Sequence, residues 1–291
     1  MKNTAKKLLS ILLALLCGLA AAAGAEAGTE TGKRKFVLLG DSIPAGEGAS
    51  EPSKAHARLL ADEYGYDVSN FAVGGHKADD LLAILAENSD ARAAIGAADI
   101  ISVSIGGNDL LATNVITMVL RMLVNKNTSA VDGPINAFRE KFARIISEIR
   151  ALNGNATLIV QTLYNSMQGV PLVEGAYGTA LAKLNRIYTD YLAENPGAYI
   201  VADVYGAFEG REGLIYPDKL HPSDAGHAMI AQVLAAAAEG RQLALDPVES
   251  VDPNALRKIV IFFRAAVDYI RYWLTQISLW QLLKNIVNFI F

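Results

Sequence analysis

A serine placed directly after a short apolar run is the first residue in this sequence that could do chemistry. Residues 36–39 read Phe-Val-Leu-Leu and lead into Gly40-Asp41-Ser42. A continuous apolar run of this length predicts a buried strand, so the Ser42 hydroxyl would stand in the loop at the carboxyl end of that strand. A serine there serves either as a helix N-cap or as a nucleophile. The interpretation of Ser42 as a nucleophile is favoured only if a base is found elsewhere in the chain.

The segment Asp218-Lys219-Leu220-His221-Pro222 offers such a base. The two residues between Asp218 and His221 let the carboxylate fold back onto the imidazole Nδ1–H while Nε2 stays free. Pro222 keeps His221 away from helical geometry. The aspartate would then fix the tautomer of the ring and stabilise the imidazolium that forms when His221 takes the serine proton. A surface turn before a helix is the alternative interpretation of the same residues.

Two further motifs could supply hydrogen-bond donors to an oxyanion. The first ends in Gly74-Gly75, and glycine permits both a positive φ and the close approach of a backbone N–H to a ligand. The second, residues 106–109, reads Gly-Gly-Asn-Asp and carries the Asn108 amide, which could also donate. Each of these motifs, taken alone, is also typical of an ordinary turn.

The elements that must position these residues alternate along the chain. Short apolar runs predict strands, and apolar residues at three- and four-residue spacing predict the helices between them. The predicted strands are 36–39, 68–72, 100–105, 157–163 and 199–204, and the predicted helices are 55–64, 78–86, 135–152, 175–192 and 228–238. Ser223 is a suitable N-cap for the last helix. This alternation predicts an α/β layer architecture with a parallel sheet, whose carboxyl edge would carry all four motifs.

Taken together and in this order, the four motifs resemble those of the SGNH/GDSL hydrolase family. The first block of that family looks like Gly40-Asp41-Ser42, and the second centres on the glycine that Gly75 matches. The third block reads G-x-N-D, as in 106–109, and the last reads D-x-x-H-P, as in 218–222. The resemblance covers about residues 36–238.

The resemblance implies a site, a fold and an activity. Ser42 would be the nucleophile of a triad with His221 and Asp218, and the oxyanion hole would consist of the Ser42 N–H, the Gly75 N–H and the Asn108 amide. The implied fold is a three-layer α/β/α sandwich around a five-stranded parallel sheet, flavodoxin-like in outline, over residues 28–245. The implied activity is hydrolysis of small-molecule or lipid esters by an esterase or lipase that needs no metal and no cofactor.

Two other functions stay open at this point. The same catalytic groups could remove O-acetyl groups from cell-wall or polysaccharide glycans. Outside enzymes, the chain could be a surface binding protein that keeps the hydrolase fold without catalysis.

Other catalytic and binding motifs are excluded. A G-x-S-x-G nucleophile elbow is missing because Pro44 stands where its second glycine would be, which disfavours an ordinary α/β-hydrolase. Gly46-x-Gly48 does not continue as a dinucleotide fingerprint, and no Walker lysine follows a glycine-rich loop. The remaining polar residues near the motifs are expected to be structural rather than reactive: His56, His76 and His227, which lack metal-ligand spacing, and Asp41, Asn70 and Asp109, which would hold loops.

Composition restricts the partners and the compartment. The chain carries 26 Lys and Arg against 30 Asp and Glu, a net charge of -4, so it lacks the basic footprint of a nucleic-acid-binding protein. Residues 1–27 combine three lysines, an apolar run and the exit Ala25-Glu26-Ala27, which predicts a secretory signal peptide. An uncleaved membrane anchor is the alternative. The single cysteine, Cys17, lies in this segment, so the mature chain would have no disulfide.

The C-terminal residues 246–291 differ in composition from the rest. Residues 246–253 read as a linker, and 254–291 predict a C-terminal extension of basic amphipathic helices. Arg271 and Lys284 enclose an uncharged stretch that is too short for a span of about 20 residues. The extension would lie in a membrane interface with Trp273 and Trp280 at headgroup depth, or dock on the hydrolase domain or a second subunit. Binding to lipid would favour a lipid ester as substrate. The expected location is secreted or extracytoplasmic.

Overall fold

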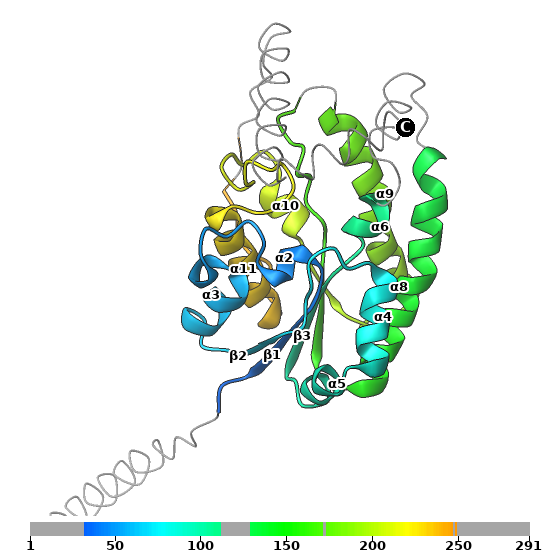
Figure 1. The fold of residues 1–291 in the computed structure, drawn as a ribbon, viewed down its shortest axis with the longest axis vertical. Coiled ribbons are helices and arrows are strands. Elements are labelled where there is room, and N and C mark those ends of the chain that lie inside the picture. The colour runs from blue at the N-terminus through cyan, green and yellow to red at the C-terminus, as the bar shows by residue number, and fades with distance from the viewer. Residues whose placement is uncertain (1–31, 112–128, 171–172, 247, 249–291) are drawn as a thin grey trace, which may run out of the picture. The chain divides into compact units, whose positions relative to one another are not determined.

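A parallel sheet of five strands forms the centre of the fold. The structure is a computed structural model that describes residues 32–111, 129–170, 173–246 and 248. The strands are β1 (Lys35–Gly40), β2 (Asp67–Asn70), β3 (Ile100–Ser104), β4 (Thr157–Gln161) and β5 (Ile200–Ala202). They pair in the order β2-β1-β3-β4-β5, and all four pairings are parallel (Figure 1). The five predicted strands are therefore confirmed.

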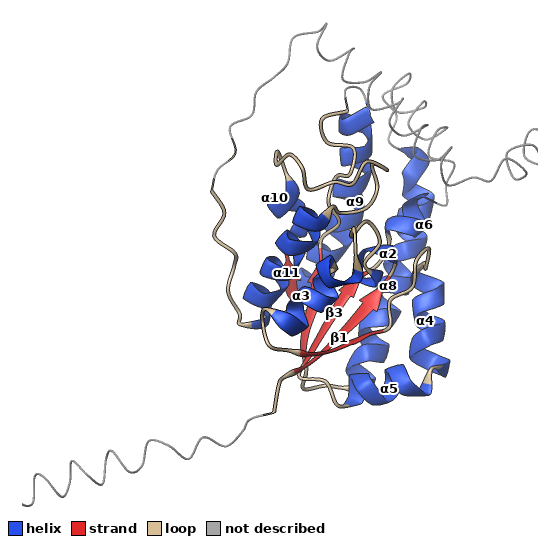
Figure 2. Ribbon diagram, turned by 60° about the vertical axis from the view of Figure 1, so that its left-hand side comes forward, coloured by secondary structure: helices blue, strands red, loops and turns tan. Residues whose placement is uncertain are grey.

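Helices cover both faces of the sheet (Figure 2). One face packs against α3 (His56–Asp62), α10 (Val204–Phe208) and α11 (Asp224–Ala238). The opposite face packs against α4 (Ala78–Glu87), α5 (Ser89–Gly96), α8 (Asp132–Leu152) and α9 (Val173–Glu194). Short helical segments lie in the connections: α2 (Ser42–Ala45), η1 (Pro52–Lys54), α6 (Gly107–Leu111) and η2 (Ser129–Val131). The predicted three-layer α/β/α sandwich is confirmed.

The sequence of β1 shows why the sheet needs both helical layers. Phe36 and Leu38 pack into the core beneath α11, whereas Val37 and Leu39 pack into the core beneath α4 and α8. All four side chains are buried. Because successive side chains of a strand point to opposite faces, a strand that is apolar throughout must be covered on both sides.

Four strands, β2 to β5, end earlier than predicted, and after two of them a side chain turns the backbone out of the sheet. After β2, the Asn70 side chain accepts a hydrogen bond from the Ala72 N–H at 3.0 Å, which starts a turn. After β5, Asp203 accepts from the Gly206 N–H at 2.9 Å and so begins α10.

The predicted N-cap of α11 is confirmed, since Ser223 accepts from the Gly226 N–H. Helix α5 was not predicted, because its eight residues are too few for a clear period.

Two predicted segments fall largely or wholly outside the described residues. These are the signal peptide, 1–27, and the C-terminal extension, of which only 246 and 248 are described. The domain boundaries 28 and 245 stay predictions. None of the described helices combines the length and the apolar character that crossing a membrane requires.

Candidate active site

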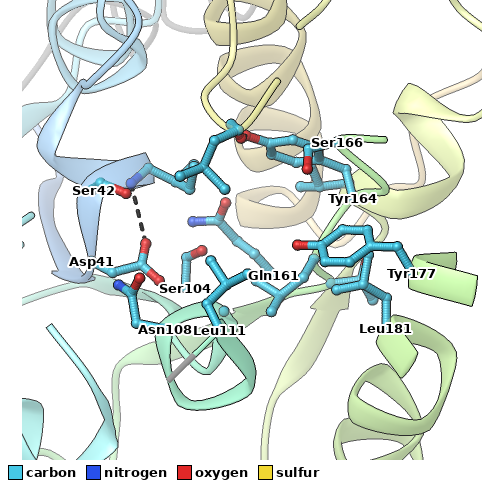
Figure 3. A pocket seen from close by; sticks show the side chains of 16 residues that line it. Asp41, Ser42, Ser104, Asn108, Leu111, Gln161, Tyr164, Ser166, Tyr177 and Leu181 are labelled. Atoms are coloured by element: carbon cyan, nitrogen blue, oxygen red, sulfur yellow. Dashed lines mark hydrogen bonds between the residues drawn. The ribbon is translucent and has the colours of Figure 1, made fainter. Parts of the chain in front are cut away.

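Backbone geometry at the end of β1 determines where Ser42 stands. Gly40 has a φ of 140°, and a Cβ at this position would lie 1.9 Å from the carbonyl oxygen of Ser104 in β3. Only glycine therefore lets the chain pass this closely and turn. Asp41 then caps α2, because its Oδ1 accepts a hydrogen bond from the Ile43 N–H at 3.1 Å (Figure 3, dashed line). Ser42 is consequently the first residue of a short helix at the carboxyl edge of the sheet.

The loop that carries His221 is held by Asp218. One carboxylate oxygen, Oδ1, accepts from the backbone N–H groups of Leu220 at 2.9 Å and His221 at 3.0 Å. The other, Oδ2, lies 2.5 Å from the ring atom Nδ1 of His221. Tyr164, which follows β4, supports the loop, since its hydroxyl donates to the Leu220 carbonyl at 2.8 Å. Ring and loop are thereby fixed by the same carboxylate.

Folding brings Ser42 and His221 together although 179 residues separate them: Ser42 Oγ lies 3.0 Å from His221 Nε2. With Nδ1–H donated to Asp218, a neutral ring keeps a lone pair on Nε2, so the Ser42 hydroxyl is the donor in this contact. Ser42 is 8% exposed and Asp218 is 2% exposed. The order serine, imidazole and buried carboxylate can activate a hydroxyl for attack on a carbonyl carbon.

The charge state of Asp218 suits this arrangement. Burial opposes its ionisation, but hydrogen bonds from the His221 ring and from the Leu220 and His221 backbone outweigh burial, so the pKa of Asp218 lies below its ordinary value. The carboxylate is therefore ionised at neutral pH and can stabilise a positive charge on the ring.

Hydrogen-bond donors surround the serine. In the part of the chain that the structure describes, the N–H groups of Ser42 and Gly75 have no hydrogen-bond acceptor. Gly75 has a φ of 79°. The Asn108 amide donates one N–H to the His76 carbonyl at 3.0 Å, which ties α6 to the residue after Gly75, and its second N–H has no acceptor there. These three groups are the donors that the sequence suggested for an oxyanion hole.

Five of the six polar residues expected to be structural have side chains that hold the backbone or pack in the core. Asp41 and Asn70 hold turns, and Asp109 Oδ2 accepts from the Ala78 N–H at the start of α4, at 3.0 Å. His56 and His227 are both fully buried, and their Nδ1 atoms lie 2.9 Å apart. Among the described residues, no group of three or more His, Cys, Asp or Glu side chains could hold a metal ion.

Asp41 has a second property that the sequence did not reveal. Burial is the largest influence on its carboxyl group and outweighs both the Ile43 N–H bond and the attraction of His221, so its pKa is raised to about 7. A carboxyl group next to Ser42 is thus partly protonated at neutral pH.

A pocket opens beside Ser42 and extends toward α9. It has a volume of about 50 Å³, and its wall includes Gln161 at the end of β4 and Tyr177 and Leu181 of α9. Figure 3 shows Ser42 and Asn108 on one side of this pocket and Tyr177 and Leu181 on the other. Sequence reasoning missed these wall residues, because they come together only when α9 packs on the sheet.

Sequence reasoning also missed a carboxylate at the His221 imidazole. Glu47 Oε2 lies 3.2 Å from His221 Nε2, the same atom that contacts Ser42. The available signal was an isolated charge between Gly46 and Gly48 directly after the serine motif.

Comparisons with known proteins agree with this fold. The chain is 27% identical over 216 residues to the spore germination lipase LipC of Bacillus licheniformis, a match that covers 71% of this chain and 97% of LipC. It is 28% identical over 206 residues to the protein YpmR of Bacillus subtilis, covering 67% of this chain and 78% of YpmR. The crystal structure of the lipase Lip_vut3 from a goat rumen metagenome shares the fold, with a TM-score of 0.55 and 24% identity over 70% of this chain and 97% of that one. The family model described as the GDSL-like lipase/acylhydrolase family matches residues 38–229, well over half of the sequence, and the chain therefore belongs to this family.

Proposed function

We propose that this protein is an extracytoplasmic serine esterase that hydrolyses carboxylic esters, with Ser42, His221 and Asp218 as its catalytic triad. The observation that carries the proposal is the continuous hydrogen-bonded chain from Ser42 Oγ to His221 Nε2, at 3.0 Å, and from His221 Nδ1 to Asp218 Oδ2, at 2.5 Å. Membership of a family of lipases and acylhydrolases supports the same reaction class. The extracytoplasmic location depends on the leader sequence alone.

The reaction would take place in two displacements. His221 Nε2 accepts the hydroxyl proton while Ser42 Oγ bonds to the acyl carbon, and the N–H groups of Ser42 and Gly75 with the Asn108 amide would hold the resulting oxyanion. When the bond to the leaving oxygen breaks, His221 returns the proton to the departing alcohol. Water then attacks the acyl-enzyme, with His221 as the base again, and releases the acid and free Ser42.

Replacing the nucleophile tests this assignment. Ser42→Ala removes the attacking oxygen but leaves the fold unchanged, so turnover of p-nitrophenyl acetate should fall by about 10⁴-fold or more. Ser89→Ala, at the exposed start of α5, is the matched control and should keep full activity. Comparable turnover by the Ser42→Ala variant and the unaltered protein would refute the proposal.

The small pocket favours a second candidate function, the removal of O-acetyl groups from glycans. Its volume is about 50 Å³, which is smaller than an enclosed cavity of about 150 Å³ that binds benzene in another protein. A two-carbon acyl group fits such a space better than a long chain. Hydrolysis rates on acetyl, butyryl and decanoyl p-nitrophenyl esters, and on an acetylated xylan, would separate a deacetylase from a lipase.

A further inference from the structure

The residue that contacts the catalytic imidazole without belonging to the triad is Glu47, and its backbone is fixed from both sides. Its N–H donates to the Ser42 carbonyl at 3.0 Å, and its carbonyl accepts from His227 Nε2 at 3.1 Å. Gly46 and Gly48 flank it with φ values of 95° and 93°, which other residues rarely adopt. The segment is therefore held in one conformation rather than in a free loop.

The same segment packs closely on the loop that carries the catalytic base. A Cβ at Gly48 would lie 2.2 Å from the Pro222 carbonyl oxygen and 2.7 Å from the His221 Cβ. Glycine at this position lets the two loops touch, so the position of Glu47 is coupled to that of His221.

The Glu47 carboxylate lies in the site rather than pointing away from it. Oε2 is 3.2 Å from His221 Nε2, and Oε1 occupies the space that a Cβ at Gly74 would take, 1.9 Å from that position. Within the described residues, His221 is the only polar partner of the carboxylate. The Glu47 side chain is 50% exposed, and the Nε2 atom of a neutral His221 ring carries a lone pair, so it does not donate a hydrogen bond to the carboxylate. The carboxylate is thus available to a bound molecule.

The chemistry of the site identifies which part of a substrate would meet this carboxylate. His221 Nε2 must deliver its proton to the leaving oxygen, which therefore lies within about 3 Å of that atom. Because Glu47 Oε2 is 3.2 Å from the same nitrogen, the leaving oxygen and the carboxylate are at most about 6 Å apart. A unit charge a few ångströms from that oxygen then lies within about one Debye length, roughly 10 Å, of the carboxylate, which is close enough for a measurable interaction.

We propose that Glu47 is a specificity-determining residue on the leaving-group side of the site. It selects esters whose alcohol carries a positive charge or a hydrogen-bond donor near the ester oxygen, and it disfavours esters of anionic alcohols. An ionised carboxylate is only an acceptor, so it pairs with a hydroxyl or a cation and repels an acid. The inference rests on the proposed esterase function.

Three acetate esters of similar shape test the inference on the full-length protein. The first, 3-(trimethylammonio)phenyl acetate, carries a positive charge on the leaving group. Its isostere 3-tert-butylphenyl acetate is neutral, and 3-acetoxybenzoate carries a negative charge. In Glu47→Gln, which keeps the shape of the side chain without its charge, the ratio of kcat/KM for the cationic ester to that for the anionic ester should fall by about three- to ten-fold. Glu87→Gln, an exposed change at the end of α4, should leave the ratio unchanged.

The outcomes separate this inference from the proposed function. A lower ratio in Glu47→Gln, with the neutral ester least affected, supports the role of Glu47. An unchanged ratio, or an equal loss on all three esters, overturns it. Absence of hydrolysis of any of the three esters by the unaltered protein would instead contradict the proposed function.

Discussion

At the scale of single residues, the carboxyl groups near Ser42 have opposite ionisation behaviour. Asp218 is stabilised as an anion by three hydrogen bonds, whereas the buried Asp41 has a pKa of about 7. One of them can therefore stabilise an imidazolium, and the other avoids placing a full negative charge where an oxyanion would form. Burial is the largest influence on Asp41 and is not outweighed there, whereas at Asp218 three hydrogen bonds outweigh it.

Asp41→Asn tests this interpretation through stability. The folded protein binds a proton at Asp41 up to about pH 7, whereas the unfolded chain releases it near pH 4, so rising pH destabilises the folded state between these values. Asparagine cannot ionise and keeps the acceptor for the Ile43 N–H. As pH rises from 5 to 8, the unaltered protein should therefore lose about 3 kcal/mol of unfolding free energy that the variant does not lose. Urea unfolding measures this, and a difference independent of pH would contradict it.

The sequence identified three residues that the structure brings together, but not the residues around them. Ser42, His221 and Asp218 could be singled out because each stands in a short motif whose residue types have few other uses. Glu47 could not be, because one charge between glycines has no period and no partner nearby in the sequence. The contact between His56 and His227 joins residues 171 positions apart, and only the packing of α3 against α11 brings them together.

At the scale of elements, these two histidines form a buried link between α3 and α11. The Glu47 carbonyl can only accept, so His227 carries its proton on Nε2 and accepts on Nδ1 from the Nδ1–H of His56. Burial lowers the pKa of both rings, that of His227 to about 4. Both rings are therefore neutral in the folded protein near neutral pH.

This link makes the free energy of unfolding depend on pH in the acidic range. The ordinary pKa of a histidine is about 6.5, so below this pH both rings bind protons in the unfolded chain but not in the folded one. The free energy of unfolding therefore falls as pH drops from about 6.5 toward 4. His56→Asn keeps a donor in place of Nδ1 but cannot ionise. The fall in unfolding free energy between pH 6 and pH 5 should be smaller in this variant by about 1 kcal/mol. Urea titrations at the two pH values test this, and an equal fall in unfolding free energy for both proteins would contradict it.

The elements themselves were predictable for a simple physical reason. Strands buried on both faces are mostly apolar, and the long helices α8 and α9 repeat their apolar residues over five or more turns. Short elements such as α2 and α6 were not predicted, because four or five residues carry no period. Their positions depend on caps and on glycine geometry instead.

At the scale of the whole molecule, the expectation for residues 246–291 can be tested without knowledge of their structure. Basic residues opposite an apolar stripe favour binding at an anionic membrane surface. A chain shortened to end at Leu245 should no longer sediment with vesicles that contain anionic lipid, whereas the full chain should. Turnover of a soluble ester should be the same for both, since the proposed triad lies before residue 245. Equal sedimentation of the two chains would exclude a membrane role for this segment.

The most direct test of the central claim locates the reactive hydroxyl by mass spectrometry. A fluorophosphonate forms a stable adduct only with a serine whose hydroxyl is activated by a base. We expect one adduct, on the peptide that contains Ser42, and loss of that adduct in His221→Ala, where Ser42 remains but its base is gone. An adduct on a different residue, or labelling of His221→Ala at the rate of the unaltered protein, would contradict it.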